Sequence, residues 1–300
     1  MRERPIGIFD SGLGGLTVLQ AVADLLPGED LVYVGDTARY PYGERTPEQL
    51  RRSSTAIAEH LVEVGAKLLV VACNSATAAA LPWLREHVEI PVIGVIEPGL
   101  RAAATVSRTG RTVVIGTTVT AASGVYEEAN ARLELGLDVT TLACPGLVEL
   151  VERGVTEGPE VTAVIRSRLE PLLTARVDTL VLGCTHFPLL ARPISQFVGR
   201  SVTLVSSADE TAFEVRELLE RTGWLNDGPA PGRHTFFTTG DAERFRRLGE
   251  RFLGLPLHDV RSQRYPALGD TPVASGYELA PPDRVVAGAT ARWTATGAAR

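Results

Sequence analysis

Two of the three cysteines stand beside hydrogen-bonding side chains at the ends of predicted strands. Cys73 is followed by an asparagine and a serine, and Cys184 is followed by Thr185 and His186. A thiol with an ordinary pKa near ~8.5 can be tuned towards neutrality, so that it both accepts and gives up a proton. Two such thiols on opposite sides of a cleft could move protons on and off the two faces of one carbon. The pattern therefore predicts a symmetric proton-transfer site.

These side chains also have plainer interpretations. A free cysteine is most often a small buried hydrophobe, and we interpret Cys144 in this way because it precedes a proline and has no acid–base neighbour in the sequence. His186 could equally cap the start of a helix or meet solvent. A redox disulfide or a zinc site is a weaker alternative, since the sequence has no C-x-x-C motif and no zinc-ligand spacing. We therefore expect no metal at this site.

A glycine-rich loop, DSGLGG at residues 10–15, follows the first predicted strand. A dinucleotide-binding G-x-G-x-x-G motif starting at Gly12 would need glycine at position 17, where the chain has Thr17. The loop can still present backbone N–H groups and a helix N-terminus to a carboxylate or phosphate, and a purely structural turn explains it equally well. A second polar cluster, residues 36–43, follows the next predicted strand. Both clusters are therefore candidate binding loops rather than a cofactor motif.

Short apolar runs alternate with helical patterns along most of the chain. The runs are rich in β-branched residues and are bounded by Gly, Pro, Asp or Asn, as expected of strands buried on both faces. They lie at residues 6–9, 31–34, 68–72, 92–95, 112–115, 179–182 and 202–205. Apolar residues recur at helical spacing between them, for example at Leu16, Leu19 and Ala23. The alternation predicts βαβ units and an α/β fold with largely parallel sheets.

The pattern is duplicated within the chain. The strand and loop at residues 6–12 resemble residues 112–118, and residues 69–75 resemble residues 179–186, with a cysteine near the end of each of the latter two segments. We predict two similar doubly wound parallel-sheet domains related by pseudo-two-fold symmetry. The active site is expected in the cleft between them, because ligands bind beyond the carboxyl ends of parallel strands.

The domain boundaries follow from where the two repeats begin and end. The first domain is predicted to comprise residues 1–97 and 208–261, and the second residues 98–207. The crossings near residues 97–99 and 206–209 would act as hinges for closure over a substrate. Between residues 262 and 300 prolines interrupt the sequence and no period is sustained, so we expect a disordered tail.

The composition excludes several functions. The chain has 300 residues, 44% of them hydrophobic, and a formal net charge of −6, so we expect no nucleic-acid partner. No apolar run approaches the ~20 residues of a membrane span, the N-terminus lacks the apolar stretch of a signal peptide, and three cysteines make no disulfide framework. These features predict a cytoplasmic protein with no membrane partner. The chain has a single lysine, Lys67, which leads into a predicted strand. Because pyridoxal phosphate enzymes need a lysine positioned to form a Schiff base, this argues against such chemistry. The sequence also contains no P-loop motif.

Five motifs in order carry a resemblance to a known family. They are IFDSGLGG at residues 8–15, GDTARYPYG at 35–43, ACNSA at 72–76, GTTVT at 116–120 and GCTHFP at 183–188. In this order and spacing the chain resembles the glutamate racemases, cofactor-independent enzymes that supply D-glutamate for bacterial cell-wall peptidoglycan. The resemblance implies an amino-acid racemase that needs no cofactor and takes a small molecule, glutamate, as its substrate.

The resemblance also implies roles for particular side chains. Cys73 and Cys184 would transfer protons on opposite faces of the substrate α-carbon. Asp10 would assist the first thiol and His186 the second. The residues that would hold the substrate are Asp10, Ser11, Tyr42, Gly43, Asn74, Ser75, Thr117, Thr120, Thr185 and His186. The further acids that the family places near the site are Asp36 and Glu152.

One position departs from the family pattern. Ser75 stands where threonine is usual, which keeps the hydroxyl donor and removes a methyl group. We therefore expect a change in affinity with the chemistry retained. The family is also associated with homodimers, and no segment of this sequence indicates an interface.

Other functions stay open at this point. An aspartate or hydantoin racemase would share the two-cysteine chemistry. A cysteine-dependent hydrolase would use one thiol as nucleophile and His186 as base, which leaves the second cysteine unexplained. A two-domain binding protein without chemistry would tolerate replacement of both cysteines.

Overall fold

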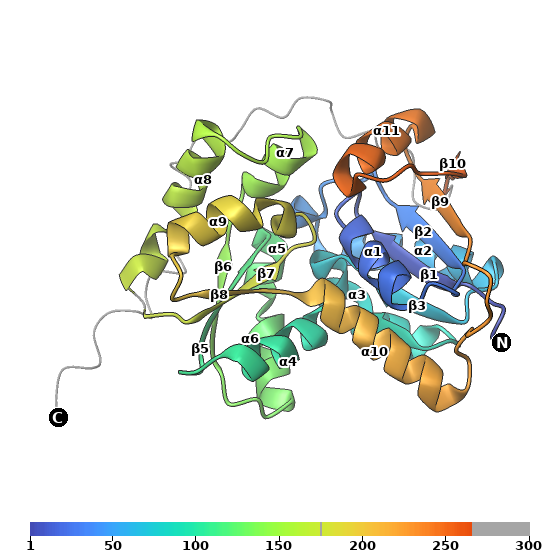
Figure 1. Cartoon of the computed structure of the whole chain (residues 1–300), viewed down its shortest axis with the longest axis horizontal. Helices are drawn as coiled ribbons and strands as arrows, with labels where there is room; N and C mark the ends of the chain where they lie inside the picture. Colours follow the sequence, from blue (N-terminus) through green and yellow to red (C-terminus); the bar gives the residue numbers. More distant parts are fainter. Residues whose placement is uncertain (175, 266–300) are drawn as a thin grey trace.

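The computed structural model describes residues 1–174 and 176–265 and contains two parallel β-sheets, each covered by helices (Figure 1). Within the described residues the larger sheet has the strand order β10-β9-β2-β1-β3-β4, with every pair parallel. Its strands are β1 (Ile6–Asp10), β2 (Leu31–Gly35), β3 (Leu68–Val71), β4 (Val92–Gly94), β9 (His234–Thr238) and β10 (Val260–Ser262). All carboxyl ends of these strands therefore lie at one edge of the sheet.

The second sheet repeats the inner part of the first. Its order is β6-β5-β7-β8, again parallel throughout. The strands are β5 (Arg111–Gly116), β6 (Asp138–Ala143), β7 (Thr179–Gly183) and β8 (Thr203–Ser206). This order matches β2-β1-β3-β4 strand for strand, so β3 and β7, which precede the two cysteines, occupy equivalent places. The predicted fold class, two similar parallel-sheet α/β domains, is confirmed.

The helices lie on both faces of each sheet. They are α1 (Leu16–Leu25), α2 (Pro47–Glu63), α3 (Asn74–His87), α4 (Ile96–Val106), α5 (Thr118–Ser123), α6 (Val125–Arg132), α7 (Leu147–Glu152), α8 (Pro159–Leu169), α9 (Ala191–Val198), α10 (Ser207–Thr222) and α11 (Ala242–Leu253). Strand side chains alternate between two cores, because successive residues of a strand point to opposite faces. Within the described chain, no helix combines the length and apolar character needed to cross a membrane.

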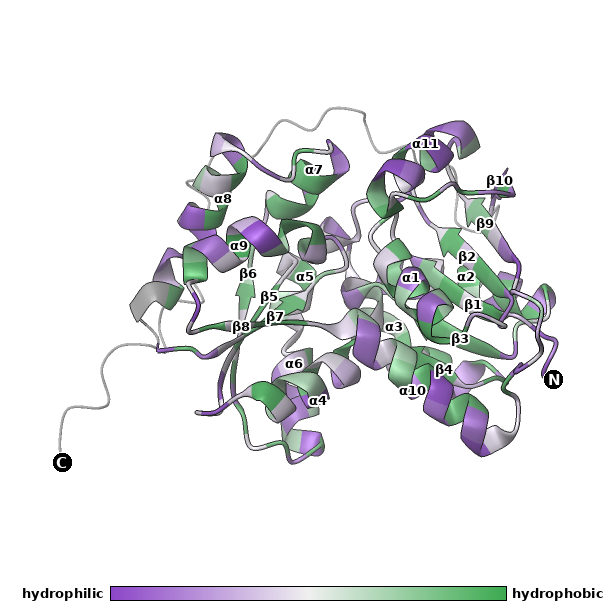
Figure 2. Ribbon diagram, viewed as in Figure 1, coloured by the Kyte–Doolittle hydropathy of each residue, from purple (hydrophilic) through white to green (hydrophobic). Residues whose placement is uncertain are grey.

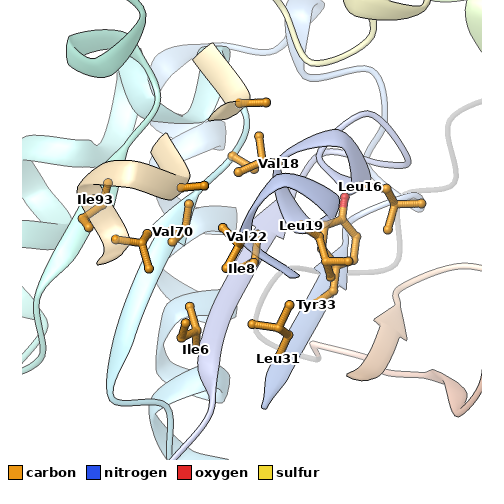
Figure 3. Close-up of a cluster of buried hydrophobic side chains, with 14 of the residues drawn as sticks. Ile6, Ile8, Leu16, Val18, Leu19, Val22, Leu31, Tyr33, Val70 and Ile93 are labelled. Atoms are coloured by element: carbon orange, nitrogen blue, oxygen red, sulfur yellow. The ribbon is translucent and has the colours of Figure 1, made fainter. Parts of the chain in front are cut away.

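The first sheet shows how the alternation builds its cores. Ile8 packs with α1 and α10 on one face, whereas Phe9 packs with α2 and α3 on the other. Figure 3 shows the first of these clusters, in which Val22 of α1 lies over Ile8 and Val70 of the central strands. The apolar strands lie inside and the polar helix faces lie outside (Figure 2). In the second sheet α7, α8 and α9 cover one face, and α4 and α6 cover the other.

The chain passes between the two sheets at α4 and α10. The predicted crossing at residues 97–99 lies in the first turn of α4, and the crossing at residues 206–209 lies where β8 leads into α10. The two helices pack against each other, and α10 continues along α1 of the first sheet (Figure 1). The domain boundaries and their use as hinges stay predictions.

Three strands were missing from the predicted set, namely β6, β9 and β10. These strands are less buried than the others. No residue of β6 is fully buried, β9 is partly buried, and β10 is a short edge strand. None of them therefore has the continuous apolar sequence of a strand buried on both faces. The expected tail also begins too early, because Ser262 pairs with Thr238 in β9 and Tyr265 is buried. Residues 262–265 thus belong to the larger sheet and its core, while residues 266–300 lie outside the described residues.

Candidate active site

The carboxyl ends of the two sheets enclose a small cavity of about 50 Å³. Both sheets contribute to it, as expected for parallel α/β units. It is lined by Ser11, Tyr40, Pro41, Tyr42, Gly43, Glu44, Cys73, Asn74, Ser75, Thr117, Thr118, Cys144, Pro145, Val148, Glu149, Cys184, Thr185 and His186. Most of the predicted site residues are therefore brought together here. The predicted residues that do not line it are Asp10, Thr120, Asp36 and Glu152.

Cys73 begins α3 and is its N-cap residue. Its Sγ accepts a hydrogen bond from the backbone N–H of Ala76 at 3.5 Å. Burial raises the pKa of the Cys73 thiol, and the negative charge of Asp10 raises it further, against the hydrogen bonds from Ala76 N–H and Ser11 that lower it. This sulfur is therefore held in the protonated thiol form.

Asp10 lies behind the cavity and joins its two halves. The side chain is fully buried at the end of β1. One carboxylate oxygen accepts a hydrogen bond from the backbone N–H of Gly12 at 2.9 Å, and the other accepts from the Thr185 hydroxyl at 3.2 Å. The acid expected to assist Cys73 thus also contacts the residue that follows Cys184.

Cys184 follows β7 and has a different partner. Its Sγ lies 3.8 Å from Nδ1 of His186, whose Nε2 lies 2.6 Å from Glu152 Oε1. Burial alone would lower the pKa of His186, but the hydrogen bonds and charges of Cys184 and Glu152 outweigh it and raise that pKa well above its ordinary value. When it is protonated, His186 donates from Nε2 to Glu152 and from Nδ1 towards the Cys184 sulfur.

Glu152 is held by a helix end and by the other half of the molecule. It is the last residue of α7, which closes at Gly154 in a left-handed conformation with Val155 N–H donating to Leu150 C=O. Arg251 of α11 donates to the Gly154 carbonyl at 3.2 Å. The ring of Phe252 meets the His186 ring edge-on, with centroids 6.4 Å apart. The His186–Glu152 pair is therefore braced by α11, which packs on the first sheet.

The glycine-rich loop at residues 10–15 packs directly against Thr185 and His186. A Cβ atom on Gly14 would collide with Thr185 Oγ1 and His186 Nδ1, and one on Gly15 would collide with the Asp10 side chain. These two glycines are thus needed because the side chains of Thr185, His186 and Asp10 pack directly against the loop backbone. This finding favours the structural interpretation of the glycines, while Ser11 in the same loop lines the cavity.

Three hydroxyl groups from both halves converge beside the thiols. Ser75 Oγ of α3 lies 2.8 Å from Thr117 Oγ1 and 3.3 Å from Thr120 Oγ1, and the two threonine oxygens are 3.1 Å apart. Thr117 is the N-cap of α5 and Thr120 is fully buried behind it. Ser75 and Thr117 therefore line the cavity with their hydroxyl groups, and Thr120 supports them.

Asp36 supports the opposite wall without lining it. Its carboxylate accepts hydrogen bonds from the Tyr42 hydroxyl at 2.6 Å, from Arg39 at 2.8 Å and from Thr239 at 2.8 Å. Burial and the Asp36 charge raise the pKa of Tyr42 well above its ordinary value, so that its hydroxyl stays protonated. Gly43 lies so close to Thr117 that an added Cβ would come within 2.9 Å of the threonine Cβ. Tyr42 and Gly43 thus bring the first half of the molecule against α5.

The sequence matches the family described as Asp/Glu/Hydantoin racemase over residues 13–215. It is 52% identical over 273 residues to a glutamate racemase of Beutenbergia cavernae, which covers 87% of this chain and 93% of that protein. A glutamate racemase isoform from Bacillus anthracis has 42% identity and a TM-score of 0.86, over 89% of this chain and 99% of that one. The chain belongs to the glutamate racemase family.

A further relative carries a ligand. The glutamate racemase of Francisella tularensis, solved in complex with D-glutamate, has a TM-score of 0.82 and 29% identity, over 88% of this chain and 98% of that one. Together these matches confirm the expected family and enzyme class, an amino-acid racemase.

Several lining residues of this racemase were not predicted from sequence. They are Glu44, Thr118, Cys144, Pro145, Val148 and Glu149. Tyr40 and Pro41 also line the cavity and lie within the candidate binding loop at residues 36–43. Glu44 follows the predicted pair Tyr42 and Gly43, so proximity in sequence could have found it. Those at residues 144–149 follow β6, a strand that sequence reasoning missed.

Two features of the lining bear on binding. Among the described residues that line the cavity, none is lysine or arginine, and the side-chain O–H and N–H donors there are hydroxyl groups, the Asn74 amide and the His186 imidazole. Among the same described residues, no group of three or more Cys, His, Asp or Glu side chains is arranged to hold a metal ion.

Cys144 packs in a core cluster, and burial raises the pKa of its thiol to about 12, which suits a buried apolar role.

Proposed function

We propose that this protein interconverts L-glutamate and D-glutamate by a two-base mechanism that uses Cys73 and Cys184. The observation that carries the proposal is the placement of the two thiols. They follow equivalent strands of two matching sheets and line one cavity from its two sides. Inversion at an α-carbon needs a proton removed from one face and returned to the other, which two monoprotic groups accomplish without moving the substrate.

The two sulfurs start in different protonation states. A thiolate on one side removes the α-hydrogen as a proton, and the C–H electron pair stays on carbon. The thiol on the other side gives its proton to the opposite face, so that one C–H bond breaks, one forms and the negative charge passes between sulfurs. The burial of Cys73 beside Asp10 supports a thiol at that sulfur, and we assign the base to Cys184, whose Sγ lies 3.8 Å from His186 Nδ1. The reverse reaction exchanges these roles.

The developing carbanion needs stabilisation by fixed donors. Ser11, Ser75 and Thr117 line the cavity with hydroxyl groups, and the Thr185 hydroxyl beside them donates to Asp10. Preorganised donors in a site closed to water stabilise developing charge without reorganisation during the reaction. These side chains, with the N-terminus of α3, would hold the carboxylates, and Asn74 would contribute to binding the ammonium group.

Glutamate is favoured over the other family substrates by the comparisons. The relatives at about half identity are glutamate racemases, and the Francisella protein binds D-glutamate. The cavity of about 50 Å³ is small for this substrate. We propose that the domains, residues 1–97 with 208–261 and residues 98–207, open at the crossings near residues 97–99 and 206–209 to admit it.

Circular dichroism of L-glutamate over time tests the proposal. The wild type is expected to bring the signal to zero without added cofactor, and Cys73→Ala and Cys184→Ala are expected to leave it unchanged. Cys144→Ala, which removes the third thiol, is the matched control and should still racemise glutamate. A flat trace from folded wild type would refute the glutamate assignment, and activity in either cysteine variant would refute the two-base mechanism. A hydrolase would instead consume an ester or amide substrate.

The proposed role is to supply D-glutamate for peptidoglycan in the cytoplasm. The support is membership in the glutamate racemase family. Expression of the wild type in a bacterium that requires added D-glutamate should restore growth without the supplement, and Cys73→Ala should fail to do so. The homodimer implied by the family stays a prediction, which sedimentation of the purified protein would test.

A further inference from the structure

Asn74 presents a buried oxygen that has no protein partner. The residue follows Cys73, lines the cavity and is only 2% exposed. Its Oδ1 is shielded from solvent and, within the described part of the chain, accepts no hydrogen bond. A buried amide oxygen without a donor is costly, so this oxygen is suited to a donor that a ligand brings.

The other end of the same amide is held by Tyr126. Asn74 Nδ2 donates to the Tyr126 hydroxyl oxygen at 2.8 Å. Because the oxygen and the nitrogen of an amide lie in one plane on either side of Cγ, a fixed Nδ2 also fixes the direction of Oδ1. The hydroxyl of Tyr126 therefore sets which face of Asn74 the substrate meets.

Tyr126 is held in a buried core and lies next to residues of both halves of the site. It lies on α6, is fully buried and packs among Leu100, Val114 and Val181 in the core of the second sheet. Its hydroxyl also lies beside Gly183, where an added Cβ would come within 3.1 Å of the oxygen. Tyr126 thus connects the residue after Cys73 with the residue before Cys184.

We propose that Tyr126 is a positioning residue whose hydroxyl orients Asn74 so that Oδ1 accepts a hydrogen bond from the substrate ammonium group. The inference rests on the proposed function, because glutamate is the ligand that brings the ammonium. An amide oxygen suits this group, since the ammonium only donates hydrogen bonds. The sequence gives no sign of the role, because Tyr126 lies outside every motif that carries the family resemblance.

The test compares two ligands that differ in the ammonium group. Binding of D-glutamate and of glutarate, the same five-carbon diacid without nitrogen, is measured by calorimetry for wild type and Tyr126→Phe. We expect Tyr126→Phe to weaken D-glutamate binding by about tenfold and glutarate by less than about twofold. In turnover the loss should appear mainly in KM, with kcat changed less. Equal weakening of both ligands, or of neither, would overturn the proposal.

Two further variants serve as a control and as a replacement for Tyr126→Phe. Tyr265→Phe is the matched control, because its hydroxyl is buried and, within the described chain, has no hydrogen-bond partner. It should change neither affinity. If thermal melting shows that Tyr126→Phe does not fold, Asn74→Leu removes the same acceptor at similar size and should show the same selectivity for the ammonium. Wild type that binds neither ligand would contradict the proposed function itself, whereas a wrong ligand pattern in an active enzyme contradicts only the role of Tyr126.

Discussion

The two halves of the site differ more in their supporting groups than in their reactive ones. Each half offers one buried cysteine after an equivalent strand. Beside Cys73 lies an anion, Asp10, which opposes a second negative charge. Beside Cys184 lies His186, whose pKa is raised by its partners. The positive charge of this imidazole favours a negative charge nearby. The two sulfurs thus lie in different electrostatic surroundings, and the proposed two-base reaction would use this difference by taking a proton from one side and returning one from the other.

The same contrast appears at the other ends of the two strands. Lys67, just before β3, is fully buried and bonds Glu29 at 2.5 Å and the carbonyls of Arg2 and Trp224. Asp178, just before β7, accepts hydrogen bonds from Ser107 and from two backbone N–H groups instead. The duplicated fold therefore anchors its cysteine-bearing strands with a cation in one half and an anion in the other. What the two halves share is strand order and cysteine position.

The largest expected effect comes from removing the support of the second thiol. His186→Asn should lower kcat by about 100- to 1,000-fold, because the thiolate loses its cation and its proton partner. Asp10→Asn should cost less and should lower the pKa of Cys73, since the negative charge that raises it is gone. Rates and pH profiles of both variants check the comparison. Matching profiles for the two variants would show that the halves are alike.

A smaller effect is expected at the anchor of β7. Asp178→Asn should lower the free energy of unfolding at neutral pH by about 1–3 kcal/mol, because backbone N–H groups lose a charged acceptor. Although burial opposes it, these hydrogen bonds depress the pKa of Asp178. Its stabilising effect is therefore present above the unfolded pKa of ~3.9 and is lost as the pH falls towards the folded value. Urea unfolding of both proteins should show the gap closing in acid; a gap independent of pH would contradict this.

The smallest expected effect tests how His186 is kept charged. Glu152 raises the pKa of His186, so Glu152→Gln should let the imidazole lose its proton at lower pH. The alkaline limb of kcat/KM should move down by about one pH unit, with the rate at the optimum reduced about tenfold. Arg192→Gln, which changes an exposed ion pair with Glu157, serves as the surface control. An unmoved limb would mean that Glu152 acts only as packing.

Much of this site was predictable because the carboxyl ends of parallel strands lie at the same edge of a sheet. The groups proposed to react lie at or just after the ends of β1, β3 and β7, and all residues of these strands are buried. Contacts from elements without such a pattern were not predictable. Residues 144–149 follow β6, in which no residue is fully buried, and Tyr126 reaches Asn74 across 52 positions of sequence. The early end assigned to the first domain has the same cause, since a short edge strand at Val260–Ser262 has little apolar periodicity.

The exchange of the α-hydrogen with solvent tests the two-base account most directly. L-glutamate is incubated with the wild type in deuterium oxide and stopped at low conversion, and the α-position of each enantiomer is examined by mass spectrometry after chiral separation. The account predicts deuterium in the D-glutamate formed, because its proton comes from the opposite, solvent-exchanged thiol, and protium in the remaining L-glutamate. D-glutamate that retains the original α-hydrogen would show that one group serves both faces, and would contradict the assignment of one cysteine to each.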